Sequence, residues 1–177
     1  MNKQELRKKM LEIRNTIPLR AEKSKKILEK LEEHKAFTEA KSVLFYYNSR
    51  SEAETVPLIR KYADLKKIYL PKVIDSAHFV AIHFSEEGKM NKSDFNIMEP
   101  EGNPFLGTPD LIIVPGVAFD KEKGRLGMGK GYYDRYLKNM IKVPKIALAF
   151  EEQMLESIPK EPYDVPVDII ITDKNIY

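Results

Sequence analysis

The sequence predicts an α/β fold with a mostly parallel sheet. Short apolar runs rich in β-branched residues alternate with amphipathic, helix-like segments along most of the chain. Several of these runs end in polar or glycine-rich segments, and open α/β sheets bind their ligands at the carboxyl ends of strands. With 177 residues and 42% hydrophobic residues, the chain can bury one substantial core. We therefore expect one domain, residues 1–177.

The composition excludes several classes of function. The net charge of +3 is too small to indicate nucleic-acid binding. The chain has no cysteine, which excludes disulfides, thiolate metal sites and cysteine nucleophiles. Its first residues, MNKQELRKKM, are charged and lack the apolar core of a secretory signal, and no apolar run reaches membrane-spanning length. We expect a cytoplasmic protein that binds small molecules and neither nucleic acid nor membrane.

The N-terminal segment predicts an amphipathic helix over residues 3–16. Its apolar side chains follow helical spacing, and Lys3, Arg7 and Arg14 fall along one edge of the apolar stripe. Taken alone, these cations are typical of a solvated basic face. A second helix begins near Pro18, because proline is favoured in the first turn of a helix.

The first strand is predicted at residues 42–47 (SVLFYY). The polar segment 48–54 follows it and leads into a helix at 55–63. Glu52 and Glu54 in this segment are either acids favoured by the dipole of that helix or ligand groups at the end of the strand.

Composition locates the rest of the sheet. Residues 85–109 are polar and rich in glycine and proline, which predicts a loop with at most one short strand. Residues 158–166 predict a second, proline-punctuated loop. Further strands are predicted at residues 67–73, 77–84, 111–114, 145–150 and 167–172.

The stretch from 111 to 137 predicts a strand, a glycine-rich loop and a helix that starts at Tyr132 and runs to Met140. Four of the eight glycines of the chain fall in the loop. Dense glycine allows positive φ angles and a close approach to backbone amides, and amides at the start of a helix form an anion site. With Lys123, Arg125 and Lys130 alongside, the loop predicts phosphate binding.

Two established phosphate-loop patterns fit this stretch poorly. Residues 124–130 match G-x-x-x-x-G-K, but Gly131 follows where a P-loop has the Ser or Thr that binds Mg²⁺. Asp134 could supply an oxygen ligand instead. The G-x-G-x-x-G order of a dinucleotide loop is also missing. A glycine-rich surface turn with solvated charges remains the alternative.

An ordered double motif resembles one known family. Val114-Pro115-Gly116-x-Ala118-Phe119-Asp120, followed by Arg125-Leu126-Gly127-x-Gly129-Lys130-Gly131-Tyr132-Tyr133-Asp134-Arg135, closely resembles the signature of the 5-formyltetrahydrofolate cyclo-ligase (methenyltetrahydrofolate synthetase) family. The resemblance implies a single three-layer α/β domain of the sugar-isomerase/CoA-transferase-like group. It also implies ATP-dependent cyclisation of 5-formyltetrahydrofolate to 5,10-methenyltetrahydrofolate, with ADP and phosphate released through a phosphorylated imidate.

The resemblance also assigns site residues. It implies that Lys130 and Arg125 are catalytic and that Asp134 and Asp164 share Mg²⁺, with ATP as co-substrate. The implied ATP site comprises Lys3, Gln4, Glu5, Leu6, Arg7, Arg125, Leu126, Gly127, Met128, Gly129, Lys130, Gly131, Tyr132 and Tyr133. The implied folate site comprises Tyr47, Glu52, Met128, Gly129, Lys130, Gly131 and Tyr132.

Two positions depart from the family pattern. Met128 stands where the family often has arginine, which removes one cation from the loop, and Asn96 stands where it usually has glycine in a GI-x-EP stretch. Core packing is an alternative role for one of Tyr132 and Tyr133. A non-catalytic nucleotide-phosphate binding module and a kinase-like phosphotransferase are the rival functions. We expect a monomer.

Overall fold

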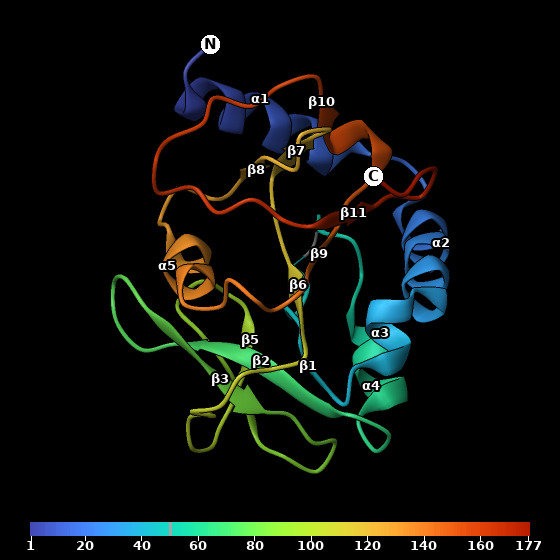
Figure 1. The fold of residues 1–177 in the computed structure, drawn as a ribbon, viewed down its shortest axis with the longest axis vertical. Coiled ribbons are helices and arrows are strands. Elements are labelled where there is room, and N and C mark those ends of the chain that lie inside the picture. Colours follow the sequence, from blue (N-terminus) through green and yellow to red (C-terminus); the bar gives the residue numbers. More distant parts are fainter. Residues whose placement is uncertain (50) are drawn as a thin grey trace.

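The computed structural model describes residues 1–49 and 51–177, and a six-stranded sheet lies at its centre (Figure 1). The strand order is β11-β9-β6-β1-β2-β3, and every pair is parallel except β2 with β3. This confirms the predicted mostly parallel sheet. The strands are β1 (Ser42–Leu44), β2 (Lys67–Val73), β3 (Phe79–His83), β6 (Leu111–Val114), β9 (Lys145–Leu148) and β11 (Ile169–Ile171).

Helices cover both faces of this sheet, so the fold has three layers. Side chains alternate between the faces of a strand. In β6, Leu111 and Ile113 belong to the core shared with α2, α3 and α4, whereas Ile112 and Val114 belong to the core shared with α5. The helices are α1 (Lys3–Thr16), α2 (Arg20–Glu33), α3 (Lys35–Glu39), α4 (Val56–Tyr62) and α5 (Tyr132–Lys138), with a 3-10 turn η1 at Glu151–Gln153. Within the described ranges, none of these helices has both the length and the apolar character that a bilayer crossing requires.

The predicted helix at residues 3–16 is confirmed, and a capping box fixes its start. The Asn2 side chain accepts a hydrogen bond from the Glu5 amide at 2.9 Å, and the Glu5 carboxylate accepts one from the Asn2 amide at 3.0 Å. The helix packs through Met10 and Leu6 on a small three-stranded sheet rather than on the main one. That sheet has the order β10-β7-β8 and comprises β7 (Ala118–Asp120), β8 (Arg125–Leu126) and β10 (Met154–Leu155).

The small sheet corrects the prediction of one long loop between β6 and α5. β7 and β8 form an antiparallel hairpin, and Gly124 lies in its turn. The fully buried Asp120 carboxylate accepts hydrogen bonds from the amides of Gly124 at 2.7 Å and Ile158 at 2.9 Å. Gly124 is therefore part of a structural turn, and the apparent G-x-x-x-x-G-K match spans a hairpin.

Residues 85–109 contain two strands where at most one was predicted. β4 (Met90–Lys92) and β5 (Met98–Pro100) pair as an antiparallel hairpin. Asn96, in its turn, has a φ of +61°, a conformation that favours glycine and that asparagine tolerates. This explains why asparagine can replace the family's glycine there.

Element ends also differ from the sequence predictions. The first strand ends at Leu44 rather than at residue 47, although Phe45 and Tyr46 remain buried. α5 ends at Lys138 rather than at Met140, and β9 and β11 are shorter than predicted. The chain on either side of these shortened strands remains partly buried after the ladder hydrogen bonds end, as at Ala149 and Phe150, and composition alone cannot separate a buried strand from a buried loop.

Candidate active site

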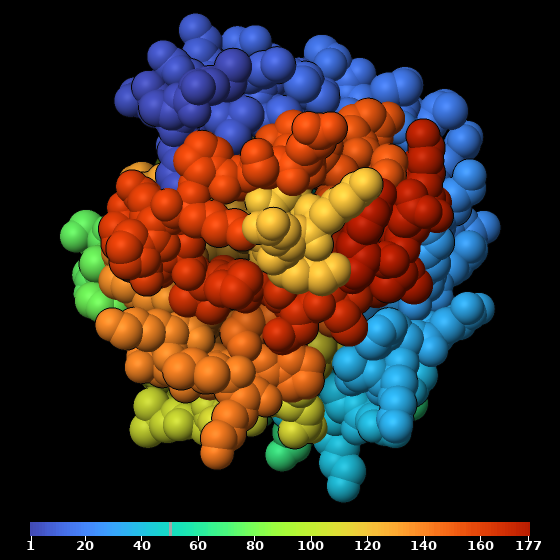
Figure 2. Space-filling view, turned by 45° about the horizontal axis from the view of Figure 1, so that its top comes forward, coloured from blue at the N-terminus to red at the C-terminus, as the bar shows by residue number. Residues whose placement is uncertain are grey.

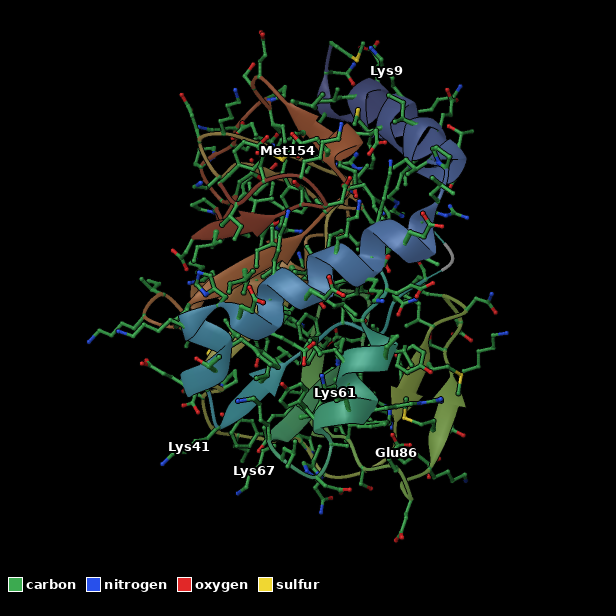
Figure 3. All side chains as sticks on the ribbon, turned by 90° about the vertical axis from the view of Figure 1, so that its right-hand side faces the viewer. Lys9, Lys41, Lys61, Lys67, Glu86 and Met154 are labelled. Atoms are coloured by element: carbon green, nitrogen blue, oxygen red, sulfur yellow. The ribbon has the colours of Figure 1, made fainter. Side chains whose placement is uncertain are left out.

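The predicted site lies at the end of the molecule toward which the parallel strands point. Lys41 and Lys67, at the starts of β1 and β2, lie at the opposite end from Lys9 of α1 (Figure 3). The carboxyl ends of β1 and of β6, which is parallel to it, therefore point toward α1 (Figure 1). This is the edge at which α/β sheets bind ligands.

Helix α1 contacts the glycine-rich segment 127–131, which joins β8 to α5. The Arg7 Nε donates a hydrogen bond to the Gly127 carbonyl at 2.7 Å. A Cβ atom on Gly129 would lie 3.1 Å from the Arg7 Cζ, and Gly129 has a φ of +98°. Glycine is thus favoured at 129 by its conformation, whereas a Cβ there would displace the Arg7 guanidinium by only a few tenths of an ångström.

Lys3 joins the same helix to the loop before β11. Its Nζ lies 2.6 Å from a Glu161 carboxylate oxygen and 2.5 Å from one of Asp164. Burial by itself lowers the pKa of Lys3, but hydrogen bonds and charge from Asp164 and Glu161 outweigh it, so the pKa is raised. Figure 2 shows the blue N-terminal helix beside orange segments from the last third of the chain.

Arg125 is the buried cation of the site. It is 7% exposed, and its guanidinium donates to Asp134 Oδ1 at 2.9 Å and to the Pro115 carbonyl at 3.3 Å. Within residues 1–49 and 51–177 its Nε has no hydrogen-bond partner. An arginine with an unused buried donor beside a glycine segment is suited to bind an anion.

The two predicted metal ligands are near neighbours. Asp134 Oδ1 accepts a hydrogen bond at 3.1 Å from the amide of Val165, the residue after Asp164. Each carboxylate pairs with a cation, Asp134 with Arg125 and Asp164 with Lys3. The described part of the chain contains no group of three or more acidic or histidine side chains arranged as a metal site. Two carboxylates completed by phosphate oxygens and water fit Mg²⁺, so Asp134 and Asp164 remain its predicted ligands.

Lys130 is exposed and lies over an aromatic ring that the sequence did not single out. Its Nζ is 4.2 Å from the ring centroid of Phe95, in the turn between β4 and β5. Arg135 donates to the Lys130 carbonyl and to the Ala77 carbonyl, both at 2.5 Å, so the β2–β3 turn supports the loop. In the sequence, Phe95 is marked only as an aromatic residue between the polar residues Asp94 and Asn96.

The two adjacent tyrosines have different surroundings. The Tyr132 hydroxyl donates to the Asp75 carbonyl at 3.2 Å on the surface of the site. Tyr133 packs against Phe79 in the core, and its buried hydroxyl has no hydrogen-bond partner among the described residues. Burial, followed by the negative charge of Glu52, raises the pKa of Tyr133. Tyr133 is therefore the member of the pair that packs in the core, which was the alternative role for one of the two tyrosines.

The predicted folate residues follow β1. Tyr47 is partly exposed, and a carboxylate oxygen of Glu52 accepts a hydrogen bond from the Ser49 amide at 2.7 Å. Glu52 lines a crevice with Tyr46, Ala53 and the Pro115-Gly116 corner after β6, which is too narrow in this structure to hold a water molecule, and Glu54 does not line it. A separate cavity of about 230 Å³ beneath the β4–β5 hairpin includes none of the predicted site residues.

The remaining predicted ATP-site residues divide between surface and core. Gln4 and Met128 are exposed, and Glu5 serves the capping box of α1. Leu6 packs against the core cluster that contains the buried Leu126. Gly131 has a φ of +69° before α5.

Together these features define an α/β protein with a predicted anion-binding site at the carboxyl edge of its sheet. A family model described as the 5-formyltetrahydrofolate cyclo-ligase family matches residues 1–173. A 5-formyltetrahydrofolate cyclo-ligase of Mus musculus is 34% identical over 161 residues, covering 82% of this chain and 79% of the mouse protein. One of Haemophilus influenzae is 33% identical over 144 residues, covering 75% and 76%.

Two solved structures of the same family have the same fold as this chain. The NMR structure of a 5,10-methenyltetrahydrofolate synthetase of Aquifex aeolicus superposes with a TM-score of 0.87 at 36% identity, covering 99% of this chain and 92% of that one. A 5,10-methenyltetrahydrofolate synthetase of Mycoplasma pneumoniae gives a TM-score of 0.79 at 28% identity, covering 98% and 99%. The chain belongs to the 5-formyltetrahydrofolate cyclo-ligase family. This places it among the carbon–nitrogen ligases that form a ring.

Proposed function

We propose that the protein uses ATP to cyclise 5-formyltetrahydrofolate to 5,10-methenyltetrahydrofolate, releasing ADP and phosphate. The main support for this proposal is that the two predicted sites meet at the Pro115-Gly116 corner after β6. The Pro115 carbonyl accepts from Arg125 of the predicted phosphate site, and Glu52 of the predicted folate site lines the crevice at the same corner. A phosphoryl donor at Arg125 and a folate at Glu52 would therefore be neighbours, once the crevice widens to admit the pterin.

The chemistry accounts for the residue types. The γ-phosphoryl group moves to the formyl oxygen: a P–O bond forms to it, and the bond to ADP breaks. The folate N10 then attacks the formyl carbon, the C–O bond breaks, phosphate leaves and N10 loses its proton. Such a transfer depends on positioning and on neutralising phosphate charge. Lys3, Arg7, Arg125, Lys130 and the amides of residues 127–131 are the groups that would do this.

Asp134 and Asp164 would hold Mg²⁺, which neutralises phosphate charge when bound. Each carboxylate is paired with a cation assigned to phosphate, Arg125 or Lys3. Nucleotide binding therefore requires these ion pairs to exchange partners. On the folate side, Glu52 would accept hydrogen bonds from the amide-like N–H edge of the pterin, with Tyr47 beside it.

An absorbance assay tests the proposal. Pure protein is mixed with 5-formyltetrahydrofolate and Mg-ATP, and the near-ultraviolet band of the methenyl product is followed. We expect the band to appear only when ATP is present, with one ADP released per product. ATP binding without product would favour the non-catalytic binding module. ATP hydrolysis without cyclisation in the presence of folate would favour a kinase-like enzyme.

The protein is further proposed to act as a monomer of one domain, residues 1–177, in the cytoplasm. Light scattering at working concentration would measure the mass, and a dimer would contradict this part of the proposal.

Met128 gives a prediction about nucleotide affinity. Its side chain is 62% exposed, so a larger residue fits without displacing the loop. We expect Met128→Arg to lower the Kd for ATP by about threefold to tenfold, because it adds a cation near the phosphates, and to lower it less at high salt. Calorimetric titration with Mg-ATP measures this.

The matched control is Ile141→Arg, which adds the same charge at a position that is 79% exposed beyond the far end of α5. Its ATP affinity should equal that of the wild type. Equal affinities for wild type and Met128→Arg would show that residue 128 does not face the phosphates.

A further inference from the structure

Arg14, in the last turn of α1, is a buried cation outside the predicted phosphate site. It is 4% exposed, which is rare for a guanidinium. Its Nε donates to the Ser51 hydroxyl at 3.0 Å, and its Nη1 donates to the Gly116 carbonyl at 3.1 Å. Its Nη1 also lies 4.0 Å from a carboxylate oxygen of Glu52. The prediction of a solvated basic edge on this helix is therefore wrong for Arg14.

Through these contacts Arg14 connects Ser51 and Glu52 to the Gly116 corner of the crevice. Ser51 is 8% exposed, and the Glu52 side chain is 17% exposed. Ser51 and Gly116 each accept from one nitrogen of the same planar group, which fixes their relative positions. Glu52 and the Gly116 corner are both walls of the crevice.

Arg14 is also the charge that balances Glu52. The titratable groups that face this carboxylate in the described residues are Arg14 from α1, Tyr46 after β1 and Tyr133 from α5. Burial lowers the pKa of Arg14 and the charge of Glu52 opposes this. Burial and then the charge of Glu52 raise the pKa of Tyr46. Both tyrosines are thus neutral, and Arg14 is the cation of the group.

We propose that Arg14 is a positioning residue for folate binding, which holds Ser51 against the Gly116 corner and so keeps the Glu52 carboxylate at the wall of the crevice. This rests on the proposed function, in which Glu52 contacts the pterin. In the same helix, Lys3 contacts Asp164 and Arg7 contacts Gly127 of the predicted nucleotide site. Because Arg14 lies beside Glu52, α1 would support both substrate sites. Loss of the Arg14 charge should nevertheless affect folate and not nucleotide.

Arg14→Gln tests the proposal because it removes the charge and keeps a polar side chain. We expect the KM for 5-formyltetrahydrofolate to rise about tenfold, while the Kd for ATP stays within about twofold. Arg14→Lys should recover part of the loss. The control is Arg20→Gln, which removes a nearby cation whose hydrogen bonds within the described residues go to the backbone carbonyls of Arg14 and Asn15. It should leave both constants unchanged.

Two readouts separate positioning from general support of the fold. Arg14→Gln should raise the KM for folate without lowering kcat, because Arg14 positions Glu52 and does not contact the reacting atoms. In a double-mutant cycle, Arg14→Gln should add nothing to the folate KM of Glu52→Gln. Additive effects, or equal losses for ATP and folate, would overturn the inference.

If Arg14→Gln does not fold, Ser51→Ala removes one hydrogen-bond partner and leaves Arg14 buried. It should raise the folate KM about threefold without changing the Kd for ATP. An unchanged folate KM would overturn the inference. The assay of the wild-type protein separates the two possible failures. If the wild type forms no methenyl product, the proposed function is wrong. If the wild type turns over normally and the variants match it, only the role of Arg14 is wrong.

Discussion

Lys130→Ala is expected to lower kcat about 1000-fold with little effect on folding. The side chain is exposed and lies over Phe95, so its removal costs about 0.5–1 kcal/mol of cation–π attraction and no packed core. The large effect on rate arises because a cation at the transferred phosphoryl group stabilises charge that develops in the transition state. Rates come from the methenyl absorbance assay, and stability comes from urea unfolding of the same preparation.

The matched control is Lys138→Ala, which removes an exposed lysine at the end of α5. It should retain the wild-type kcat. If Lys130→Ala raised only the KM for ATP and left kcat intact, Lys130 would bind the ground state and the assigned catalytic role would be wrong.

Asp134→Ala is expected to be the most destabilising single change in the site, by about 3 kcal/mol in the free energy of unfolding. The Arg125 side chain is 3% exposed, and Asp134 is its only carboxylate within the described residues. Removing Asp134 leaves a buried cation without its anion and leaves the Val165 amide without its acceptor. Urea unfolding without nucleotide or metal measures this contribution separately from any role in binding Mg²⁺.

The double variant Arg125→Met/Asp134→Leu should recover much of that stability, because it removes both charges from the buried pair. Glu122→Ala is the surface control. It breaks the exposed ion pair with Lys160 and should change stability by less than about 0.5 kcal/mol. If Asp134→Ala cost no more than Glu122→Ala, the Arg125–Asp134 pair would not support the fold. The unfolding free energies of these variants do not depend on which reaction the protein catalyses.

Local patterns determined much of the fold. The helix at 3–16 follows from its apolar spacing, and Asn2 and Glu5 set its start through contacts within one turn. The strand at 111–114 follows from a run of apolar residues between breakers. The mostly parallel order follows from the alternation of strands and helices. Each of these signals lies within a few residues along the chain.

Only the tertiary structure assigned partners across long distances in sequence. Residue spacing could not show that Arg14 is buried between Ser51, 37 residues away, and Gly116, 102 residues away. It could not show that Phe95 lies beneath Lys130 or that Asp120 closes the turn at Gly124. The motif determined the family and the candidate residues. The tertiary structure decided which of those side chains are paired, buried or exposed, because these properties depend on how distant segments pack together.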